Sequence, residues 1–325
     1  MLLKSYMKIF NIIIVITGFL ILSFMLSINE SFKNSLKNHI DERDPNREFI
    51  LNPADSICRP NSNKTILLLT FVVIAPHSFE KRKLIRSTWG QTSLFTDMRL
   101  IFAVGMSKND TVNKMIVDEF KTFNDIIQKN YTDSYYNLTT KIMMSFKWIS
   151  KYCNNSKYVL RINDDVVVNT FALIDYLKRI EYRPNRIFGW VVHNAWVKRD
   201  KNSKFYIPYS VFNRSQYDTY AEGSAYILTN ELTSVFYEKS LSFYVPVFSD
   251  WLEDILIGMF AKQHNSTFIQ IWYAYVPHTQ YGSYSTQDKL KMIAKKGVNN
   301  TLFIYEESEF KFFWSEIVEK MYLTF

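Results

Sequence analysis

Two carboxylates and an amide follow one another directly after a short apolar run. A buried strand is predicted for 158–162, and Asn163, Asp164 and Asp165 come next. Adjacent acids at the end of a core strand must stay solvated or find a cation, and ligands bind at this edge of an α/β sheet. Oxygen ligands there suit Mn²⁺ or Mg²⁺, which commonly hold the phosphates of a nucleotide. The structural alternative is an Asx turn that caps a helix beginning near Thr170.

A second acidic pair, Glu253 and Asp254, precedes a probable helix over 255–262. The pair would lie at the positive end of that helix, where a carboxylate should stay ionised. An ionised carboxylate is the state that a general base needs before it accepts a proton. Plain capping of the helix is the alternative.

Four motifs in a fixed order carry a resemblance to a known family. They are Arg-Ser-Thr-Trp-Gly at 86–90, Asp-Ser-Tyr-Tyr-Asn-Leu-Thr at 133–139, Asn-Asp-Asp at 163–165 and Glu-Asp-Ile-Leu-Ile-Gly at 253–258. Together they resemble the β-1,3-galactosyltransferase family of inverting glycosyltransferases, which includes β-1,3-N-acetylglucosaminyltransferases. The resemblance covers about 49 to 278, most of the chain beyond its N-terminal segment.

The resemblance implies a role for each acidic residue. Asp165 would ligate the Mn²⁺ or Mg²⁺ that bridges the donor diphosphate, while Asp164 and Asn163 would lie near the ribose or donor sugar. Asp254 maps to the general base of the family, and His278 would complete the metal shell with an imidazole. The family usually has three aspartates at 163–165, so Asn163 is a departure that bears on metal affinity or donor choice.

Three further positions have two readings each. Arg86 would bind a donor phosphate bidentately, or it anchors its own helix. Gly223 resembles the family's glycine turn near the donor sugar, or it is a simple hairpin glycine. His193 and His264 compete with His278 as the metal-binding histidine.

The implied reaction is a one-step inverting displacement on a UDP-sugar. Galactose or N-acetylglucosamine would move to a sugar hydroxyl of a glycan, on protein or lipid, in a β-1,3 linkage. Two rival functions are open: a catalytically silent relative that binds glycans or assists a partner transferase, and a glycoside hydrolase that uses the paired acids.

Strands and helices alternate in the pattern of a doubly wound sheet. The pattern and the resemblance together predict an α/β fold of the GT-A type, with a Rossmann-type, mostly parallel sheet flanked by helices. Strands are predicted at 66–74, 100–104, 125–128 and 157–162, and helices at 79–89, 111–123 and 135–152. Further on, strands are predicted at 205–209 and 226–229 with Gly223 in a turn between them, and no role is assigned to the chain from 283 onward.

An apolar run at 9–27 is about long enough to cross a bilayer as a helix. Lys4 and Lys8 precede it, which places the N-terminus in the cytoplasm. We expect a cytoplasmic tail at 1–8, a signal anchor at 9–27, a stem at 28–62 and a luminal transferase domain at 63–325. We therefore expect a single-pass type II protein of the Golgi membrane; a cleaved signal peptide is the alternative.

Sequons and cysteines support a luminal domain. Acceptor triplets for N-glycosylation begin at Asn63, Asn109, Asn130, Asn137, Asn154, Asn213, Asn265 and Asn299. The 2 cysteines, Cys58 and Cys153, can pair in an oxidising lumen, or remain two buried thiols.

The formal charge of +8 does not indicate nucleic acid binding, because the basic residues are scattered. A hydrophobic share of 47% is enough for one large domain or two small ones.

Overall fold

The computed structural model describes residues 48–58, 65–245, 247–248, 250–271, 274–276, 284–306 and 308–322. The chain divides into two compact units, residues 1–51 and 52–325, and the fold below is that of the second. Among the described residues, no helix is long and apolar enough to cross a membrane. The predicted anchor at 9–27 and nearly all of the predicted stem lie outside them, so the predicted domain boundaries stay predictions.

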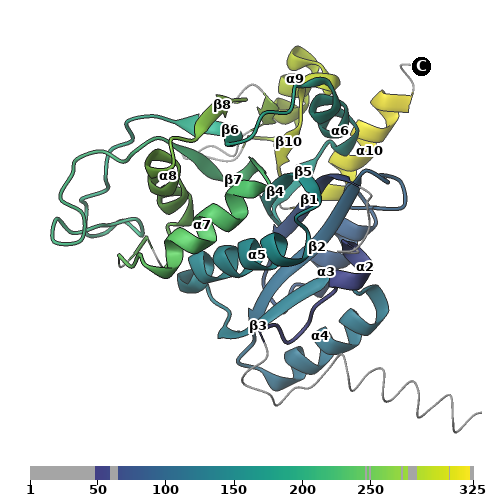
Figure 1. The fold of residues 1–325 in the computed structure, drawn as a ribbon. Coiled ribbons are helices and arrows are strands. Elements are labelled where there is room, and N and C mark those ends of the chain that lie inside the picture. The colour runs from purple at the N-terminus through teal and green to yellow at the C-terminus, as the bar shows by residue number, and fades with distance from the viewer. Residues whose placement is uncertain are drawn as a thin grey trace, which may run out of the picture. The chain divides into compact units, whose positions relative to one another are not determined.

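A seven-stranded mixed sheet forms the centre of this unit, in the order β3-β2-β1-β4-β7-β6-β8 (Figure 1). All of its strands run parallel except β7, which is antiparallel to both β4 and β6. The strands are β1 Ile66–Val73, β2 Met98–Met106, β3 Ile126–Thr132, β4 Ser156–Asn163, β6 Arg186–Val192, β7 Tyr220–Thr229 and β8 Thr267–Gln270. The carboxyl ends of six strands therefore share one edge with the beginning of β7.

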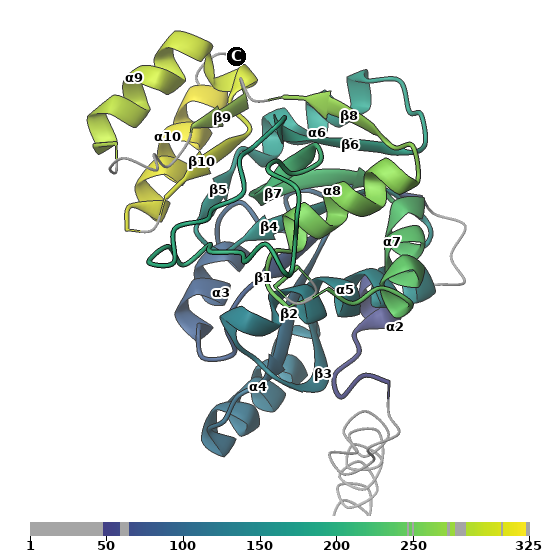
Figure 2. The same cartoon turned by 90° about the vertical axis from the view of Figure 1, so that its left-hand side faces the viewer.

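Helices cover both faces of the sheet. The helices α5, α7 and α8 pack against one another on one face, and α3 and α4 lie on the other (Figure 2). The helix bounds are α2 Ala54–Ile57, α3 Phe79–Arg86, α4 Asp110–Phe123, α5 Leu138–Tyr152, α6 Thr170–Arg179, α7 Glu231–Leu241, α8 Glu253–Gln263, α9 Thr286–Lys296 and α10 Phe310–Tyr322. The described residues also form the short 3-10 helices η1 Tyr135–Asn137 and η3 Val298–Asn300.

Part of the core lies between α5 and the sheet, where apolar side chains of this helix are buried. Ile142, Phe146 and Ile149 have no exposed surface. Phe146 meets Phe71 of β1 edge-to-face, with ring centroids 5.9 Å apart. This packing fixes the middle of α5 against β1.

The segment after 283, which the sequence left without a role, folds against the chain that follows the acidic cluster. A second sheet has the order β5-β10-β9, with β5 Val166–Val168, β9 Tyr275–Val276 and β10 Phe303–Tyr305. β5 begins directly after Asp165, and β10 runs antiparallel to it. The C-terminal segment therefore helps to hold the acidic cluster in place.

The structure confirms the predicted strands and helices of the first half, with shifts of a few residues at their ends. In the second half, the strand predicted at 205–209 is wrong, because these residues lie in the loop 193–219 between β6 and β7. Gly223 lies inside β7 and not in a turn. The sequence reading did not identify β6 or α7.

Cys58, which follows α2, forms a disulfide with Cys153, which follows α5. Their Cα atoms are 5.2 Å apart, within the usual range for a disulfide.

Of the sequon asparagines, Asn63 lies outside the described residues and Asn137 is half-buried. The side chains of Asn109, Asn130, Asn154, Asn213, Asn265 and Asn299 are exposed, as an acceptor for a glycan must be.

We predict that Cys58→Ser, Cys153→Ser and the double variant each lower the free energy of unfolding by about 4 kcal/mol, because the disulfide closes a long loop in the unfolded chain. Denaturant unfolding under non-reducing conditions measures this. The double variant is the matched control, since it removes the same cross-link as each single variant. A loss in the double variant that is twice the single loss, or no loss at all, would contradict the prediction.

Candidate functional site

The acidic cluster lies at the carboxyl edge of the sheet, as predicted. Asn163 is the last residue of β4 and pairs with Val73, the last residue of β1. Asp164 and Asp165 then form the turn into β5. The hydroxyl of Tyr305 on β10 donates to Asp165 Oδ2 over 2.7 Å, and the Glu306 N–H donates to the Asp165 carbonyl over 2.8 Å. The turn is thus fixed by β10, the central strand of the second sheet, and by the residue that follows it.

Two lysines that the sequence reading missed place positive charge near Asp164. Burial and the charge of Asp165 raise the pKa of Asp164, while the charges of Lys81 and Lys141 lower it. Lys81 is on the first turn of α3, and its ammonium lies over the Phe310 ring, 4.9 Å from the centroid. The two lysines give this edge a mixed charge that suits a phosphate beside a carboxylate.

Lys141 is buried at the start of α5. Its ammonium donates to the carbonyl of Ile74 over 2.7 Å and forms an ion pair of 2.9 Å with Asp133. Burial lowers the pKa of Lys141, and Asp133 opposes that shift. A signal was present in the sequence, because Lys141 lies three residues after Leu138 in a predicted helix and so borders its apolar side, where a lysine needs a partner.

A buried ion pair connects the acidic cluster to α8. Arg161 of β4 and Glu253 of α8 lie 2.5 Å apart, with 1% and 2% of their side chains exposed. Arg161 also donates to Asn163 Oδ1 over 2.7 Å, and the Tyr226 hydroxyl donates to the other oxygen of Glu253 over 3.0 Å. Asn163 therefore accepts from an arginine within its own strand, and this contact needs no charge on residue 163.

Asp254 follows Glu253 in the first turn of α8. Its side chain is partly exposed, and Oδ1 accepts from the N–H of Ile255 over 2.8 Å. Burial raises the pKa of Asp254 to about 7, with further contributions from the charges of Glu253 and Glu222. Burial and the two neighbouring carboxylates therefore oppose the ionisation that was expected for a carboxylate at a helix N-terminus. A carboxylate with a pKa near the working pH is a well-matched general base.

Gly223 approaches Asp254 closely. A Cβ atom on Gly223 would lie 3.2 Å from Asp254 Oδ2 and 3.4 Å from its Cγ. Ala225, two residues on, pairs with Ile162 of β4. The backbone of β7 thus brings Asp254 to the strand that carries the acidic cluster, and a glycine here leaves room for the carboxylate.

Of the two readings of Arg86, the contacts in the structure fit the anchoring one. Its guanidinium forms ion pairs of 2.7 Å with Asp125 and 2.6 Å with Glu119, and it lies 4.0 Å from the centroid of the Phe123 ring. Glu119 also pairs with Arg82 over 2.6 Å. Since carboxylates already hold this guanidinium between α3 and α4, the structure favours the anchoring alternative over donor binding.

The histidines do not complete a metal site within the described residues. His278 lies outside them. His193 follows β6 and contacts the Thr219 hydroxyl over 3.1 Å, and His264 caps the end of α8. No group of three His, Cys, Asp or Glu side chains in this part of the chain is placed to hold a metal ion. Asp164 and Asp165 still offer the one or two carboxylates with which proteins bind Mg²⁺ together with substrate phosphates.

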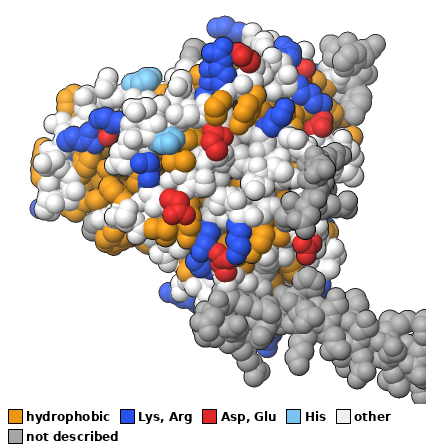
Figure 3. Space-filling model, in the orientation of Figure 1, with side chains coloured by type: hydrophobic (Ala, Val, Ile, Leu, Met, Phe, Trp, Pro, Cys, Tyr) orange, Lys and Arg blue, Asp and Glu red, His pale blue; other side chains and the backbone are white. Residues whose placement is uncertain are grey.

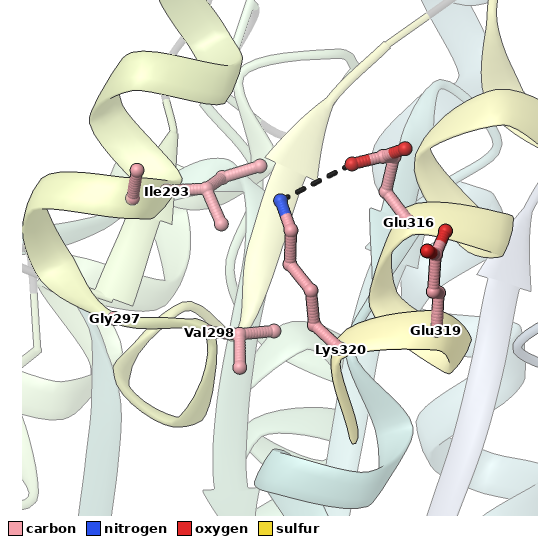
Figure 4. Close-up of a pocket in the computed structure, with 7 residues that line it drawn as sticks. Ile293, Gly297, Val298, Glu316, Glu319 and Lys320 are labelled. Atoms are coloured by element: carbon pink, nitrogen blue, oxygen red, sulfur yellow. Dashed lines mark ion pairs between the residues drawn. The ribbon is translucent and has the colours of Figure 1, made fainter. Parts of the chain in front are cut away.

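A pocket of about 430 Å³ lies between α9 and α10 (Figure 4). Ile293 and Val298 line it together with the ion pair of Lys320 and Glu316, which spans 3.1 Å. None of the predicted site residues lines this pocket. The candidate site is therefore the carboxyl edge of the large sheet, which offers paired carboxylates for a cation and a base beside them.

Comparison with known proteins gives a family. Residues 80–270 match the family model described as Galactosyltransferase. Lactosylceramide 1,3-N-acetyl-beta-D-glucosaminyltransferase of Xenopus tropicalis is 31% identical over 229 residues, which cover 67% of this chain and 59% of that protein. Beta-1,3-galactosyltransferase 1 of Mus musculus is 31% identical over 218 residues, or 65% and 64% of the two chains. The match thus spans less than two thirds of the length of these relatives.

Solved structures show weaker likeness. The WbbM bifunctional glycosyltransferase has a TM-score of 0.42 and 10% identity, over 81% of this chain and 52% of that one. A glycosyltransferase involved in glycosylation of the major capsid of PBCV-1 has a TM-score of 0.41 and 10% identity. The match covers 79% of this chain and 99% of that one. Scores this low add nothing to the argument about the site.

We predict that Arg161→Met and Glu253→Gln each lower the free energy of unfolding by about 3 to 5 kcal/mol, because each leaves a buried partner without its counter-charge. The double variant should lose less than the sum of the two. Denaturant unfolding measures all three. Lys178→Met is the matched control: its ion pair with Asp97 is about half exposed and should contribute below about 1 kcal/mol. Additive losses in the double variant would show that the two residues do not depend on each other.

Proposed function

This chain belongs to the galactosyltransferase family, and from that premise we propose that it is a metal-dependent inverting hexosyltransferase. It moves galactose or N-acetylglucosamine from a UDP-sugar to a sugar hydroxyl of a glycan, in a β-1,3 linkage. The printed names of two relatives, a 1,3-N-acetylglucosaminyltransferase and a β-1,3-galactosyltransferase, support this choice of sugars and linkage. The UDP carrier is an expectation from the resemblance. The fold is proposed to be of the GT-A type, which the mixed sheet flanked by helices supports.

Asp165, with Asp164 beside it, is proposed to hold Mn²⁺ or Mg²⁺ together with the donor diphosphate. The pair supplies hard oxygen ligands on one turn, and these match such ions. When bound, the ion acts as a Lewis acid that stabilises the leaving diphosphate. Lys81 adds a positive charge near Asp164, and we assign it to the phosphates. His278 as a further ligand stays a prediction, since it lies outside the described residues.

Asp254 is proposed to act as the general base. A hydroxyl oxygen of the acceptor sugar attacks the anomeric carbon of the donor and forms the new C–O bond. The bond from that carbon to the diphosphate oxygen breaks, and its electron pair leaves with UDP. The hydroxyl proton passes to the carboxylate of Asp254. Attack opposite to the leaving group inverts the anomeric centre.

One observation carries this proposal: the approach of Gly223 to the Asp254 carboxylate, on a strand that pairs with β4. It brings the proposed base to the edge that holds the proposed donor site. Such proximity of base and donor is what a direct displacement requires.

The setting of the reaction is proposed from the sequence. The apolar run at 9–27 would anchor the protein in the Golgi membrane as a type II protein, with the transferase domain in the lumen. The exposed sequon asparagines and the disulfide of Cys58 with Cys153 support an oxidising, glycosylating compartment.

We predict that the full chain releases UDP from UDP-galactose or UDP-N-acetylglucosamine when Mn²⁺ and simple acceptor glycosides are present. Asp254→Asn and Asp165→Asn should each lower this release at least a hundredfold, the first by removing the base and the second by weakening the hold on the diphosphate. Asp175→Asn, an exposed acid on α6, is the matched control. Binding of UDP without any release would indicate a silent relative, and metal-independent release of free sugar from a simple glycoside would indicate a hydrolase.

We predict that kcat/KM for the acceptor falls as the pH is lowered through about 7. Asp254 must be deprotonated to act as the base, and its pKa is raised to about 7. We call this fall the acid limb of the pH profile. Below that pH the rate should fall tenfold per unit. Glu222→Gln should move the limb to lower pH, because it removes a negative charge that raises this pKa. A limb that stays in place or moves to higher pH in Glu222→Gln would contradict the assignment.

A further inference from the structure

Four aromatic side chains from three separate segments meet just before α8. The ring of Trp251 lies 5.3 Å from Tyr135, 6.5 Å from Tyr136 and 5.7 Å from Phe205, between centroids. Trp251 itself is 8% exposed, whereas Tyr135 is 52%, Tyr136 69% and Phe205 37% exposed. We call these four residues the aromatic shelf. Exposed aromatic groups gathered in this way mark a binding surface more often than a stability device.

The structure holds the shelf in position from both sides. The Thr139 N–H donates to the carbonyl of Asp250 over 3.0 Å, and the Thr139 hydroxyl donates to the carbonyl of Phe248 over 2.9 Å. These bonds tie the start of α5, and with it the tyrosines of η1, to the segment that carries Trp251. The rings are therefore arranged before any ligand arrives, which reduces the entropy lost on binding.

Phe205 comes from the loop 193–219, and one arginine organises that loop. Arg199 donates to the carbonyls of Ile207, Phe212 and Arg214 over 2.5, 2.7 and 2.8 Å. Figure 3 shows hydrophobic side chains gathered at the left of the view, where Figure 1 places this loop. A long loop that is fixed internally and presents aromatic rings is typical of a recognition element.

The shelf borders the proposed base. Trp251 is three residues before Asp254 in the chain. Burial is the larger cause of the raised pKa of Tyr135, and the charge of Asp254 contributes to it. The charge of Asp254 likewise contributes to the raised pKa of Tyr220 at the beginning of β7, where burial is the larger cause. A molecule that covers the shelf would therefore lie within reach of the Asp254 carboxylate.

We propose that the aromatic shelf is the acceptor subsite and that it stacks against the apolar C–H face of a pyranose ring. The proposal rests on the transferase function proposed above. The three exposed rings, which pack against the buried Trp251, suit one or two sugar units, and the tyrosines add hydroxyl groups at the edge for the sugar's own hydroxyls. The shelf would thus recognise the glycan itself. A simple glycoside should therefore be an acceptor, whatever aglycone the sugar carries. A lipid bilayer or a flat protein surface would call for a larger continuous apolar area.

Initial-rate kinetics of the full chain with a methyl or benzyl glycoside acceptor test the proposal. Tyr136→Ala and Phe205→Ala should each raise the acceptor KM about tenfold, since a lost ring contact of about 1.4 kcal/mol is one factor of ten. The donor KM should change less than twofold. Tyr136→Trp should restore the acceptor KM to within threefold. Phe312→Ala, an exposed aromatic of α10, is the matched control, and thermal unfolding shows that each variant is folded.

An unchanged acceptor KM in folded Tyr136→Ala and Phe205→Ala would overturn the proposal. So would a loss that appears only in binding to phosphatidylcholine vesicles or only with a protein acceptor. If the full chain transfers no sugar at all, the proposed function fails. Whether the aromatic shelf binds a glycan is then tested separately, by the quenching of tryptophan fluorescence on addition of glycosides. Quenching that Tyr136→Ala abolishes would support a glycan-binding shelf, and no quenching in the unmutated chain would overturn it.

Discussion

The candidate site depends on one buried ion pair, between Arg161 of β4 and Glu253 of α8. Removing both charges from water is costly, so the pair is favourable only while its geometry is kept and its remaining polar atoms are bonded. Asn163 accepts a hydrogen bond from Arg161 and Tyr226 donates one to Glu253, while the buried Nε of Arg161 has no partner among the described residues. The pair therefore fixes the end of β4 and the beginning of α8 at the same time. Asp164, which opens the acidic turn, directly follows Asn163, and Asp254 directly follows Glu253. This one contact therefore sets the positions of both the proposed donor site and the proposed base.

The same contacts set the electrostatics. Burial, Glu253 and Glu222 together raise the pKa of Asp254 to about 7, while Arg161 acts in the opposite direction. An aspartate at position 163 would give Arg161 a second carboxylate and add negative charge close to the base. The amide of Asn163 keeps the hydrogen bond without that charge. Its departure from the family pattern thus concerns the balance of charge around Arg161 and Asp254, while Asp164 and Asp165 retain the hard oxygen ligands that the proposed cation needs.

Local patterns predicted the strands and helices that carry the site, because β1, β4, α5 and α8 have clear apolar periodicity or runs. Long-range contacts could not be predicted in this way. Arg86 was assigned to a phosphate, but its partners Glu119 and Asp125 lie 33 and 39 residues further on. Tyr305, which holds Asp165, lies 140 residues away in a segment without a motif. Gly223 was recognised as special, and only the tertiary structure shows that its missing side chain makes room for Asp254.

The central claim is that donor and base meet at the carboxyl edge of the large sheet. A crystal structure of the full chain carrying Asp254→Asn, with UDP-galactose, Mn²⁺ and an acceptor glycoside, tests it most directly, because the substitution should leave the substrates bound and unreacted. We predict a diphosphate beside Asp164 and Asp165, with the acceptor hydroxyl between residue 254 and the anomeric carbon. A donor bound away from this turn, for example in the pocket between α9 and α10, would contradict the account.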